Sequence, residues 1–254
     1  MDSGLGGLTV IKELEQILPH ENLIYFGDNA NCPYGNRPKE EILKLSIATL
    51  DFLQDQGVKI VAIACNTIST LIDEFRQQYD FPIVSIIEEA CEYAANKKLD
   101  RLGVFATEFT INNGLYSTLL GRLSPETKVH GVSSRTLAAL VDDGRFYDPA
   151  TDAEILSMLN NLLKDHPETK NIVLGCTHYP IVQDMFEKAA PDLSFINPAV
   201  VQAEAVRRLL TEQGLLNSAS QPTLHINTSG NTKLYEKALK KLGIATPYIV
   251  TAVG

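Results

Sequence analysis

Two cysteines stand in the same local context. Cys65 ends the apolar run 60–64, and Cys176, 111 residues further on, ends the apolar run 171–175. A lone cysteine at the end of a strand is most simply an inert core residue, because cysteine is among the most buried residue types. Here both cysteines are followed at once by hydrogen-bonding side chains, where a core would continue apolar: Asn66, Thr67, Thr177 and His178.

The position of each cysteine indicates the chemistry it can do. A buried parallel strand that runs into a helix delivers its last residue to the edge where open α/β sheets place their sites. Helix N-termini at that edge lower the pKa of a thiol and hold anionic ligands. The repeat therefore leaves two interpretations open: a matched pair of acid/base thiols that face each other across a cleft, or two unrelated core residues.

Strands and helices alternate along most of the chain, which is typical of a parallel sheet covered by helices. The pattern predicts two similar parallel-sheet α/β domains with the active site in the cleft between them. We expect residues 1–92 and 205–254 to form the first domain and residues 93–204 the second. The elements expected from periodicity and breakers are helices 8–18, 38–56, 66–79, 90–97, 135–143, 151–165 and 231–242, and strands 23–26, 60–64, 82–87, 101–106, 128–132, 171–175 and 223–227. Two further helices are expected, one from about residue 110 and one after Pro198.

Composition excludes several classes of protein. The 254 residues carry a net charge of −9 and no basic stripe, so we expect no nucleic-acid partner. No apolar run approaches the ~20 residues of a membrane span, and the chain start lacks a secretory signal. The four cysteines are widely spread without a CxxC pair, which predicts free thiols in a reducing cytoplasm. Cys176 and His178 alone are too few ligands for a metal site, so no metal is expected.

The glycine-rich segment Asp2–Gly7 opens the first helix in the manner of a phosphate cradle. It fits neither phosphate template, because it lacks the Gly-Lys-Ser/Thr of a Walker loop and has Thr9 where a dinucleotide loop needs glycine. Its glycines instead let backbone N–H groups approach some other anion.

Taken together, the motifs resemble those of the glutamate racemases. They lie in order, at that family's spacing, over almost the whole chain. Any one of them is weak evidence, but several in register are strong. The matching segments are Asp2–Val10, Tyr25–Asp28, Cys32–Gly35, Ala64–Thr67, Leu174–Pro180 and Thr228–Gly230.

The resemblance implies a racemase that interconverts L- and D-glutamate without a cofactor and supplies D-glutamate for peptidoglycan. Inverting an α-carbon needs a base on one face and an acid on the other, and two thiols can fill both roles. The resemblance assigns the catalytic thiols to Cys65, assisted by Asp2, and to Cys176, assisted by His178. It assigns substrate binding to Ser3, Pro33, Tyr34, Gly35, Asn66, Thr67, Thr110 and Thr177.

Some positions depart from the family pattern, and they leave alternatives open. An apolar strand precedes the Asp-Ser-Gly motif in the family, whereas Met1 abuts Asp2 here. Asp142 stands where a glutamate is usual, and Asn197 where an aspartate is usual. The alternatives are a racemase for aspartate or another small amino diacid, and a ligand-binding relative without turnover. The partner expected in each case is a small amino acid, and the oligomeric state stays open, a homodimer included.

Overall fold

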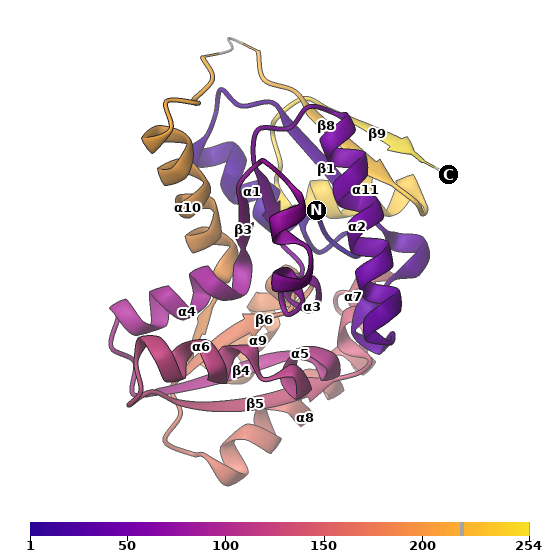
Figure 1. The fold of residues 1–254 in the computed structure, drawn as a ribbon. Coiled ribbons are helices and arrows are strands. Elements are labelled where there is room, and N and C mark those ends of the chain that lie inside the picture. The colour runs from indigo at the N-terminus through magenta and orange to yellow at the C-terminus, as the bar shows by residue number, and fades with distance from the viewer. Residues whose placement is uncertain (219–220, 254) are drawn as a thin grey trace.

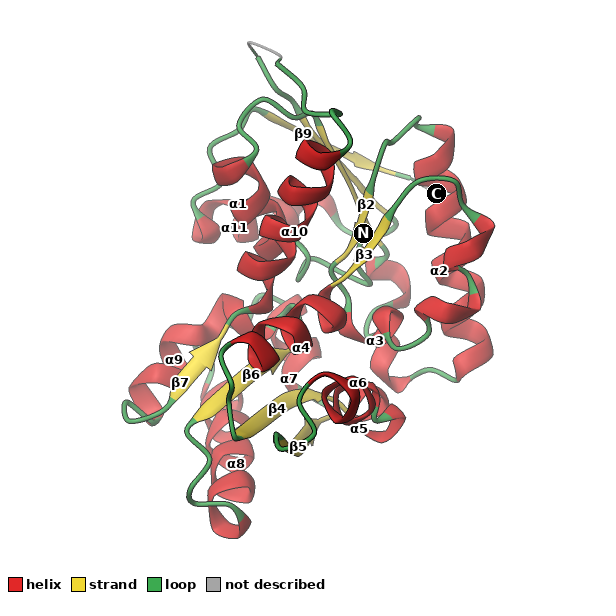
Figure 2. Cartoon of the chain, turned by 60° about the vertical axis from the view of Figure 1, so that its left-hand side comes forward, coloured by secondary structure: helices red, strands yellow, loops and turns green. Residues whose placement is uncertain are grey.

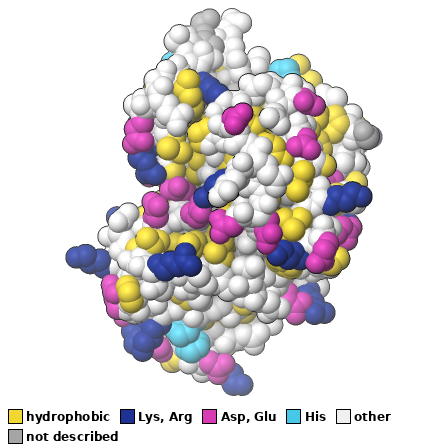
Figure 3. All heavy atoms as spheres, in the orientation of Figure 1, with side chains coloured by type: hydrophobic (Ala, Val, Ile, Leu, Met, Phe, Trp, Pro, Cys, Tyr) yellow, Lys and Arg dark blue, Asp and Glu magenta, His cyan; other side chains and the backbone are white. Residues whose placement is uncertain are grey.

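The computed structural model describes residues 1–218 and 221–253 as a mixed α/β fold. Every strand pair among these residues is parallel. The strands fall into two halves: β1, β2, β3, β8 and β9 lie in the upper half of Figures 1 and 2, and β4 to β7 lie in the lower half. The outline narrows where the halves meet, and Lys and Arg side chains are dispersed among acidic ones on the face shown in Figure 3. The expected fold class is confirmed.

The strands are β1 (Leu23–Gly27), β2 (Val61–Ile63), β3 (Ile83–Ser85), β4 (Arg101–Thr107), β5 (Lys128–Ser134), β6 (Asn171–Gly175), β7 (Ser194–Ile196), β8 (Leu224–Thr228) and β9 (Tyr248–Ala252). The α-helices are α1 (Leu8–Ile17), α2 (Lys39–Asp55), α3 (Asn66–Ser69), α4 (Ile86–Asn96), α5 (Glu108–Asn113), α6 (Leu115–Leu123), α7 (Leu137–Asp142), α8 (Pro149–Asp165), α9 (Gln183–Ala189), α10 (Pro198–Glu212) and α11 (Thr232–Leu242). The 3₁₀ turns are η1 (Asn29–Asn31), η2 (Tyr34–Asn36), η3 (Ile72–Glu74), η4 (Arg76–Gln78) and η5 (Tyr179–Val182).

The lower half contains one four-stranded sheet in the order β5-β4-β6-β7. Its central strands β4 and β6 are buried along almost their whole length, as expected for parallel strands with helices on both faces. Right-handed crossovers place α5 and α6 on one face and α7 to α9 on the other, because the chain moves in opposite directions along the sheet before and after β5 (Figure 2). Cys176 follows directly from the end of β6.

The upper half contains two smaller sheets, β1-β8-β9 and β2-β3, which do not pair with each other directly. Among the described residues, the first two of the chain bridge them by backbone hydrogen bonds. The Met1 nitrogen donates to the Ala62 carbonyl (2.9 Å) and the Ala64 N–H donates to the Met1 carbonyl (3.0 Å). On the other side, the Asp2 N–H donates to the carbonyl of Phe26 (3.0 Å). Met1 and Asp2 thus lie between β1 and β2 and pair with both, as the last residues of a strand inserted there would.

The residues after Cys65 do not form the long helix that the sequence predicts. Helix α3 covers only Asn66–Ser69, and the 3₁₀ turns η3 and η4 follow. Serine and threonine explain the early end, since their hydroxyls compete for backbone groups. The Thr70 hydroxyl donates to the Thr67 carbonyl (2.7 Å). The short strands β7 and β9, at Ser194–Ile196 and Tyr248–Ala252, were not expected from periodicity.

Helices α4 and α10 connect the two halves and pack against each other. The predicted boundary at residue 92 falls inside α4, and the one at residue 205 falls inside α10. The division of the chain into domains at these residues stays a prediction. Among the residues that the structure describes, no helix has the length and apolar character needed to cross a membrane.

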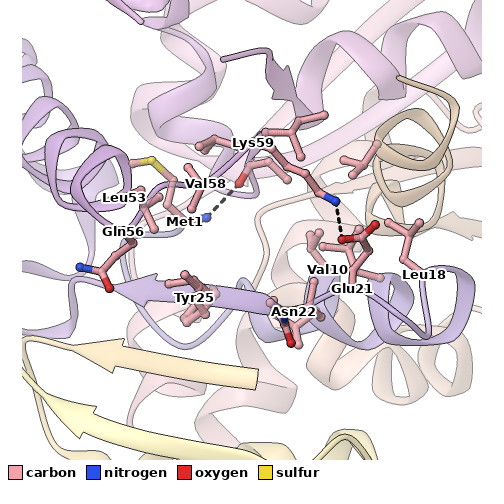
Figure 4. Close-up of a pocket in the computed structure, with 18 of the residues that line it drawn as sticks. Met1, Val10, Leu18, Glu21, Asn22, Tyr25, Leu53, Gln56, Val58 and Lys59 are labelled. Atoms are coloured by element: carbon pink, nitrogen blue, oxygen red, sulfur yellow. Dashed lines mark hydrogen bonds and ion pairs between the residues drawn. The ribbon is translucent and has the colours of Figure 1, made fainter. Parts of the chain in front are cut away.

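The open strand position between β1 and β2 leaves a cavity of about 390 Å³. Figure 4 shows Met1 at one end of it and the ion pair between Lys59 and Glu21 (2.7 Å) at another part of its wall. Its other lining side chains are mostly apolar. Those from helices α1, α2 and α10 are Val10, Ile11, Leu14, Leu53, Val206 and Leu210, and Leu18 follows directly after α1. The cavity therefore matches one apolar parallel strand that ends on Met1.

We expect a chain lengthened before Met1 by four apolar, β-branched residues to be more stable than the chain described here. The added residues would pair with both β1 and β2 and bury their side chains in the cavity. Thermal unfolding should show a rise in Tm of at least roughly 3 °C. A matched extension with proline at its second position lacks one N–H and should give little of this rise. Equal Tm values for the two extensions would contradict the prediction.

Candidate active site

Residues from both halves line one small cavity of about 10 Å³. The volume is about that of a single water molecule, so the groups around it lie close together. Cys65 comes from the end of β2, and Cys176 from the end of β6 in the other half. The lining residues are Ser3, Pro33, Tyr34, Gly35, Cys65, Asn66, Thr67, Thr107, Ala138, Gly175, Cys176, Thr177 and His178.

Cys65 is buried at the start of α3, and its Sγ lies 3.7 Å from the Ser3 Oγ. Burial raises the pKa of this thiol to about 12, and the nearby Asp2 carboxylate adds to the rise. The Ile68 N–H and the Ser3 hydroxyl act in the opposite direction, because hydrogen bonds favour the thiolate. Without a ligand, Cys65 is therefore a protonated thiol. A helix N-terminus is expected to lower the pKa of this thiol, but burial outweighs that effect at Cys65.

Cys176 lies beside a buried hydrogen-bonded pair. Its Sγ is 3.7 Å from Nδ1 of His178, whose Nε2 is 2.9 Å from Oδ1 of Asp142. Burial alone would lower the pKa of His178, but its hydrogen bonds to Asp142, Cys176 and Cys32 hold that pKa well above its ordinary value. A protonated imidazole donates from both nitrogens, so His178 can donate to Asp142 and to Cys176 at the same time.

Asp2 is fully buried and accepts two hydrogen bonds. Its Oδ1 accepts from the Gly4 N–H (3.0 Å), and its Oδ2 accepts from the Thr177 hydroxyl (2.9 Å). Burial raises the pKa of this carboxyl, while the charge of His178 and the two hydrogen bonds oppose the rise. Asp2 thus contacts the segment that follows Cys176. Its assistance to Cys65 stays a prediction.

The side chains after Cys65 offer hydrogen-bonding groups to a ligand. Asn66 Oδ1 accepts from the Tyr116 hydroxyl (2.8 Å), whereas its buried Nδ2 has no partner among the described residues. A buried unpaired donor is costly in a protein interior, so this amide is a group that a bound ligand would satisfy. The Thr67 hydroxyl lies 3.0 Å from that of Thr107 and 3.3 Å from that of Thr110, which links the two halves of the fold.

The loop 33–35 forms another wall of the cavity. The Tyr34 hydroxyl donates to Oδ2 of Asp28 (2.6 Å), so this group is already committed inside the protein. A Cβ atom at Gly35 would lie 2.4 Å from the Cβ of Thr107, which only glycine avoids. Pro33 and Gly35 therefore contribute shape and backbone to the site.

The structure brings together all the predicted site residues. Asp2 and Thr110 lie just behind the lining, in contact with Thr177 and Thr67. Prediction missed Thr107, Ala138 and Gly175 as lining residues, together with the contact of Asn29 with Asp142. For Thr107 and Gly175 a signal existed, because each ends a buried strand of the lower sheet.

Two groups of potential metal ligands occur among the described residues, and neither is arranged as a ligand set. In the group Cys32, Asp142 and His178, the imidazole and the carboxylate bond to each other instead of pointing at a common centre. In the group His130, His166 and Glu168, the two rings stack at 3.5 Å, so their in-plane lone pairs do not converge. We assign no metal site to either group, and the expectation of a reaction without metal stays a prediction.

Comparison with known proteins gives a consistent result. A family profile described as Asp/Glu/Hydantoin racemase matches residues 6–206. A glutamate racemase of Neisseria meningitidis serogroup C is 36% identical over 220 residues, which cover 85% of this chain and 81% of the relative. The crystal structure of glutamate racemase isoform RacE1 from Bacillus anthracis is 30% identical with a TM-score of 0.90, covering 100% of this chain and 95% of that one. The same values hold for the Francisella tularensis glutamate racemase in complex with D-glutamate.

The Asp142–His178 pair should give a pH-dependent contribution to stability. Burial raises the pKa of Asp142, but the hydrogen bond and charge of His178 outweigh it and hold this pKa below the ordinary 3.8. The contribution of Asp142 is therefore present above pH 3.8 and fades as pH falls through its lower folded pKa. The contribution of His178 is present below its ordinary pKa of 6.5 and fades as pH rises through its higher folded pKa.

Asp142→Asn should therefore lower the free energy of unfolding most between about pH 4 and pH 6.5, by on the order of 3 kcal/mol, and less above the raised pKa of His178. Denaturant unfolding at pH 5 and pH 10 measures the difference. Asp143→Asn changes the exposed neighbour and should stay within about 0.5 kcal/mol of the unchanged chain. A loss in Asp142→Asn that is constant across this range would contradict the pairing.

Proposed function

The chain belongs to the Asp/Glu/Hydantoin racemase family, and from that premise we propose that it racemises glutamate without a cofactor, by a two-cysteine, two-base mechanism. One observation carries the proposal: Cys65 and Cys176, contributed by different halves of the fold, line the same cavity. An α-carbon between two such sulfurs can lose its proton to one and gain a proton from the other.

Each turnover in this mechanism breaks one C–H bond and forms another. The thiolate on one face takes the α-proton, and the electron pair left on the carbon spreads into the α-carboxylate. The thiol on the opposite face then gives its proton to the carbon, which inverts the configuration. The first sulfur ends as a thiol and the second as a thiolate, so the reverse direction uses the same groups with exchanged roles.

The different environments of the two sulfurs support the proposal that one acts as acid and the other as base. Cys65 is a thiol in the closed site, because burial raises its pKa to about 12. Cys176 instead lies beside the imidazole of His178, whose Nδ1 is 3.7 Å from its Sγ. The two sulfurs therefore have different neighbours in the resting site. The positive ammonium of an amino acid substrate would further favour thiolate formation near the α-carbon.

Several groups are available to hold the substrate. The unpaired Nδ2 of Asn66 suits a carboxylate, and the Ser3 and Thr67 hydroxyls line the same cavity. Such donors also stabilise the charge that develops on the α-carboxylate as the proton leaves. A cavity of about 10 Å³ does not accommodate an amino acid, so we expect the two halves to separate when the substrate enters.

The biological setting follows from the proposed reaction. We propose that the product, D-glutamate, is used in peptidoglycan and that the protein acts in the cytoplasm. Cys32, Cys65, Cys91 and Cys176 are all free thiols, which suits a reducing compartment. A homodimer stays a prediction.

Alanine substitutions of the cysteines test the mechanism. Cys65→Ala and Cys176→Ala should each lower racemisation of L-glutamate by at least about a hundredfold, because each removes an acid/base group. Cys91→Ala is the matched control: this buried cysteine contacts the Tyr116 carbonyl outside the cavity and should stay within a few-fold. Circular dichroism of the substrate measures the rate, and that of the protein checks the fold.

Parallel assays separate the proposal from its alternatives. Faster racemisation of L-aspartate than of L-glutamate would move the assignment to a different amino diacid. Binding of glutamate without any change of its optical activity would indicate a ligand-binding relative. Near-normal turnover by either cysteine variant would contradict the two-cysteine mechanism.

Deuterium labelling tests whether the two thiols act on opposite faces. The base keeps the proton that it removes, whereas the acid delivers a hydrogen that has exchanged with solvent. In D₂O, the D-glutamate formed early from L-glutamate should therefore carry deuterium at the α-carbon, and recovered L-glutamate should stay protiated. Mass spectrometry of the separated enantiomers at initial rates gives the answer. Substantial early deuterium in the recovered L-glutamate would point to one base that serves both faces.

A further inference from the structure

Asn29 lies at the start of η1, directly behind the Asp142–His178 pair. Its Nδ2 donates to both carboxylate oxygens of Asp142, at 3.1 Å to Oδ1 and 2.9 Å to Oδ2. Its Oδ1 accepts from the Thr228 hydroxyl (3.1 Å) and from the Tyr235 hydroxyl. The orientation of the amide is unambiguous, because a carboxylate only accepts and the nitrogen must therefore face it.

These contacts extend a row of hydrogen bonds that ends at a proposed catalytic sulfur. From Asn29 the row passes through Asp142 to Nε2 of His178 (2.9 Å) and from Nδ1 of His178 to Cys176 (3.7 Å). We propose that Asn29 is a positioning residue for the reaction: it fixes the Asp142 carboxylate so that Oδ1 meets His178, and His178 in turn meets Cys176. The inference rests on the proposed function, because it assigns Asn29 a role on the Cys176 side of that mechanism.

The surroundings of Asn29 restrict it to one arrangement. Tyr235 is fully buried, packs edge-on against Tyr25, and also donates to the Gly4 carbonyl (3.2 Å). A Cβ atom at Gly230 would come within 2.5 Å of the Asn29 Cβ, so the turn after β8 closes directly over this residue. Asn29 is thus held by β8 and α11 from the upper half of the fold, while Asp142 lies on α7.

Asn29 supports Asp142 without adding charge. His178 faces Asp142, Cys176, Cys32 and Asp2, and Asp142 also faces the hydroxyls of Tyr25 and Tyr235. Two neutral N–H donors stabilise the carboxylate as an anion, and the anion keeps His178 protonated. Without these donors the ionised form of Asp142 would be less stable. His178 would then lose its proton at a lower pH, and Cys176 would lose the cation beside it.

Asn29→Leu removes the donors at similar size, and Asn29→Asp replaces them with a second carboxylate against Asp142. For both variants we expect kcat to fall roughly tenfold, less than for loss of an acid/base group, with KM within about threefold. In Asn29→Leu the alkaline limb of the kcat–pH profile should move to lower pH. Asn29→Ser keeps one hydroxyl donor, so kcat should fall less than in Asn29→Leu. This variant also tests the proposal if Asn29→Leu and Asn29→Asp do not fold.

Asn31→Ala is the matched control. Asn31 lies on the same turn and donates in the same way to both oxygens of Asp28 (3.1 and 3.0 Å), which is outside the row. The Asn31→Ala variant should leave the alkaline limb of the kcat–pH profile unchanged. A shift of the limb in this variant as large as that in Asn29→Leu would overturn the proposal, since the effect would then belong to the turn.

Nitrogen-15 NMR of the imidazole of His178, assigned with His178→Gln, follows the proton directly and needs no turnover. The imidazole should titrate at lower pH in Asn29→Leu than in the unchanged chain. Folded Asn29→Leu and Asn29→Ser proteins with unchanged titration and unchanged pH profiles would overturn the proposal. If the unchanged chain does not racemise glutamate, the proposed function fails, while the titration still decides whether Asn29 holds the Asp142–His178 pair.

Discussion

The first five residues make the hydrogen bonds on which the rest of the site depends. Met1 and Asp2 together join the edges of β2 and β1, Asp2 also accepts from Thr177, and the Gly4 carbonyl accepts from Tyr25 (2.5 Å). The Leu5 N–H donates to Oδ1 of Asp142 (3.1 Å). One short backbone segment therefore contacts both small sheets, the segment after Cys176 and the carboxylate behind His178.

Glycine is what allows this segment to lie so close to its partners. A Cβ atom at Gly6 would come within 2.4 Å of the Thr177 Oγ1, and one at Gly4 within 2.6 Å of Oδ1 of Asp142. The segment therefore acts through backbone groups and close packing, not as a phosphate cradle. Placing Asp2 in this packed environment raises its pKa, and the hydrogen bonds from Gly4 and Thr177 offset part of the cost of burying a carboxylate.

The two cysteines have similar positions at the ends of strands but different electrostatic surroundings. Cys65 has an anion and a hydroxyl beside it, whereas Cys176 has an imidazolium that is supported by Asp142. These different neighbours distinguish the two sides of the site, and Asn29 donates to Asp142 on the Cys176 side.

The sequence alone predicted the fold class and the position of the two cysteines, because hydrophobic periodicity specifies strand ends without knowledge of the tertiary contacts. Most of the other predicted site residues came from the resemblance of the motifs to those of the glutamate racemases. Only the tertiary structure decided which groups meet. Asp2 and Thr177 are 175 residues apart, and Asn29 and Asp142 are 113 residues apart. It also decided the protonation of Cys65 and His178, since their pKa values depend on burial and on neighbours that are distant in the chain. Helix α3 ended early for the same kind of reason, because hydroxyl groups made tertiary and backbone hydrogen bonds that periodicity does not report.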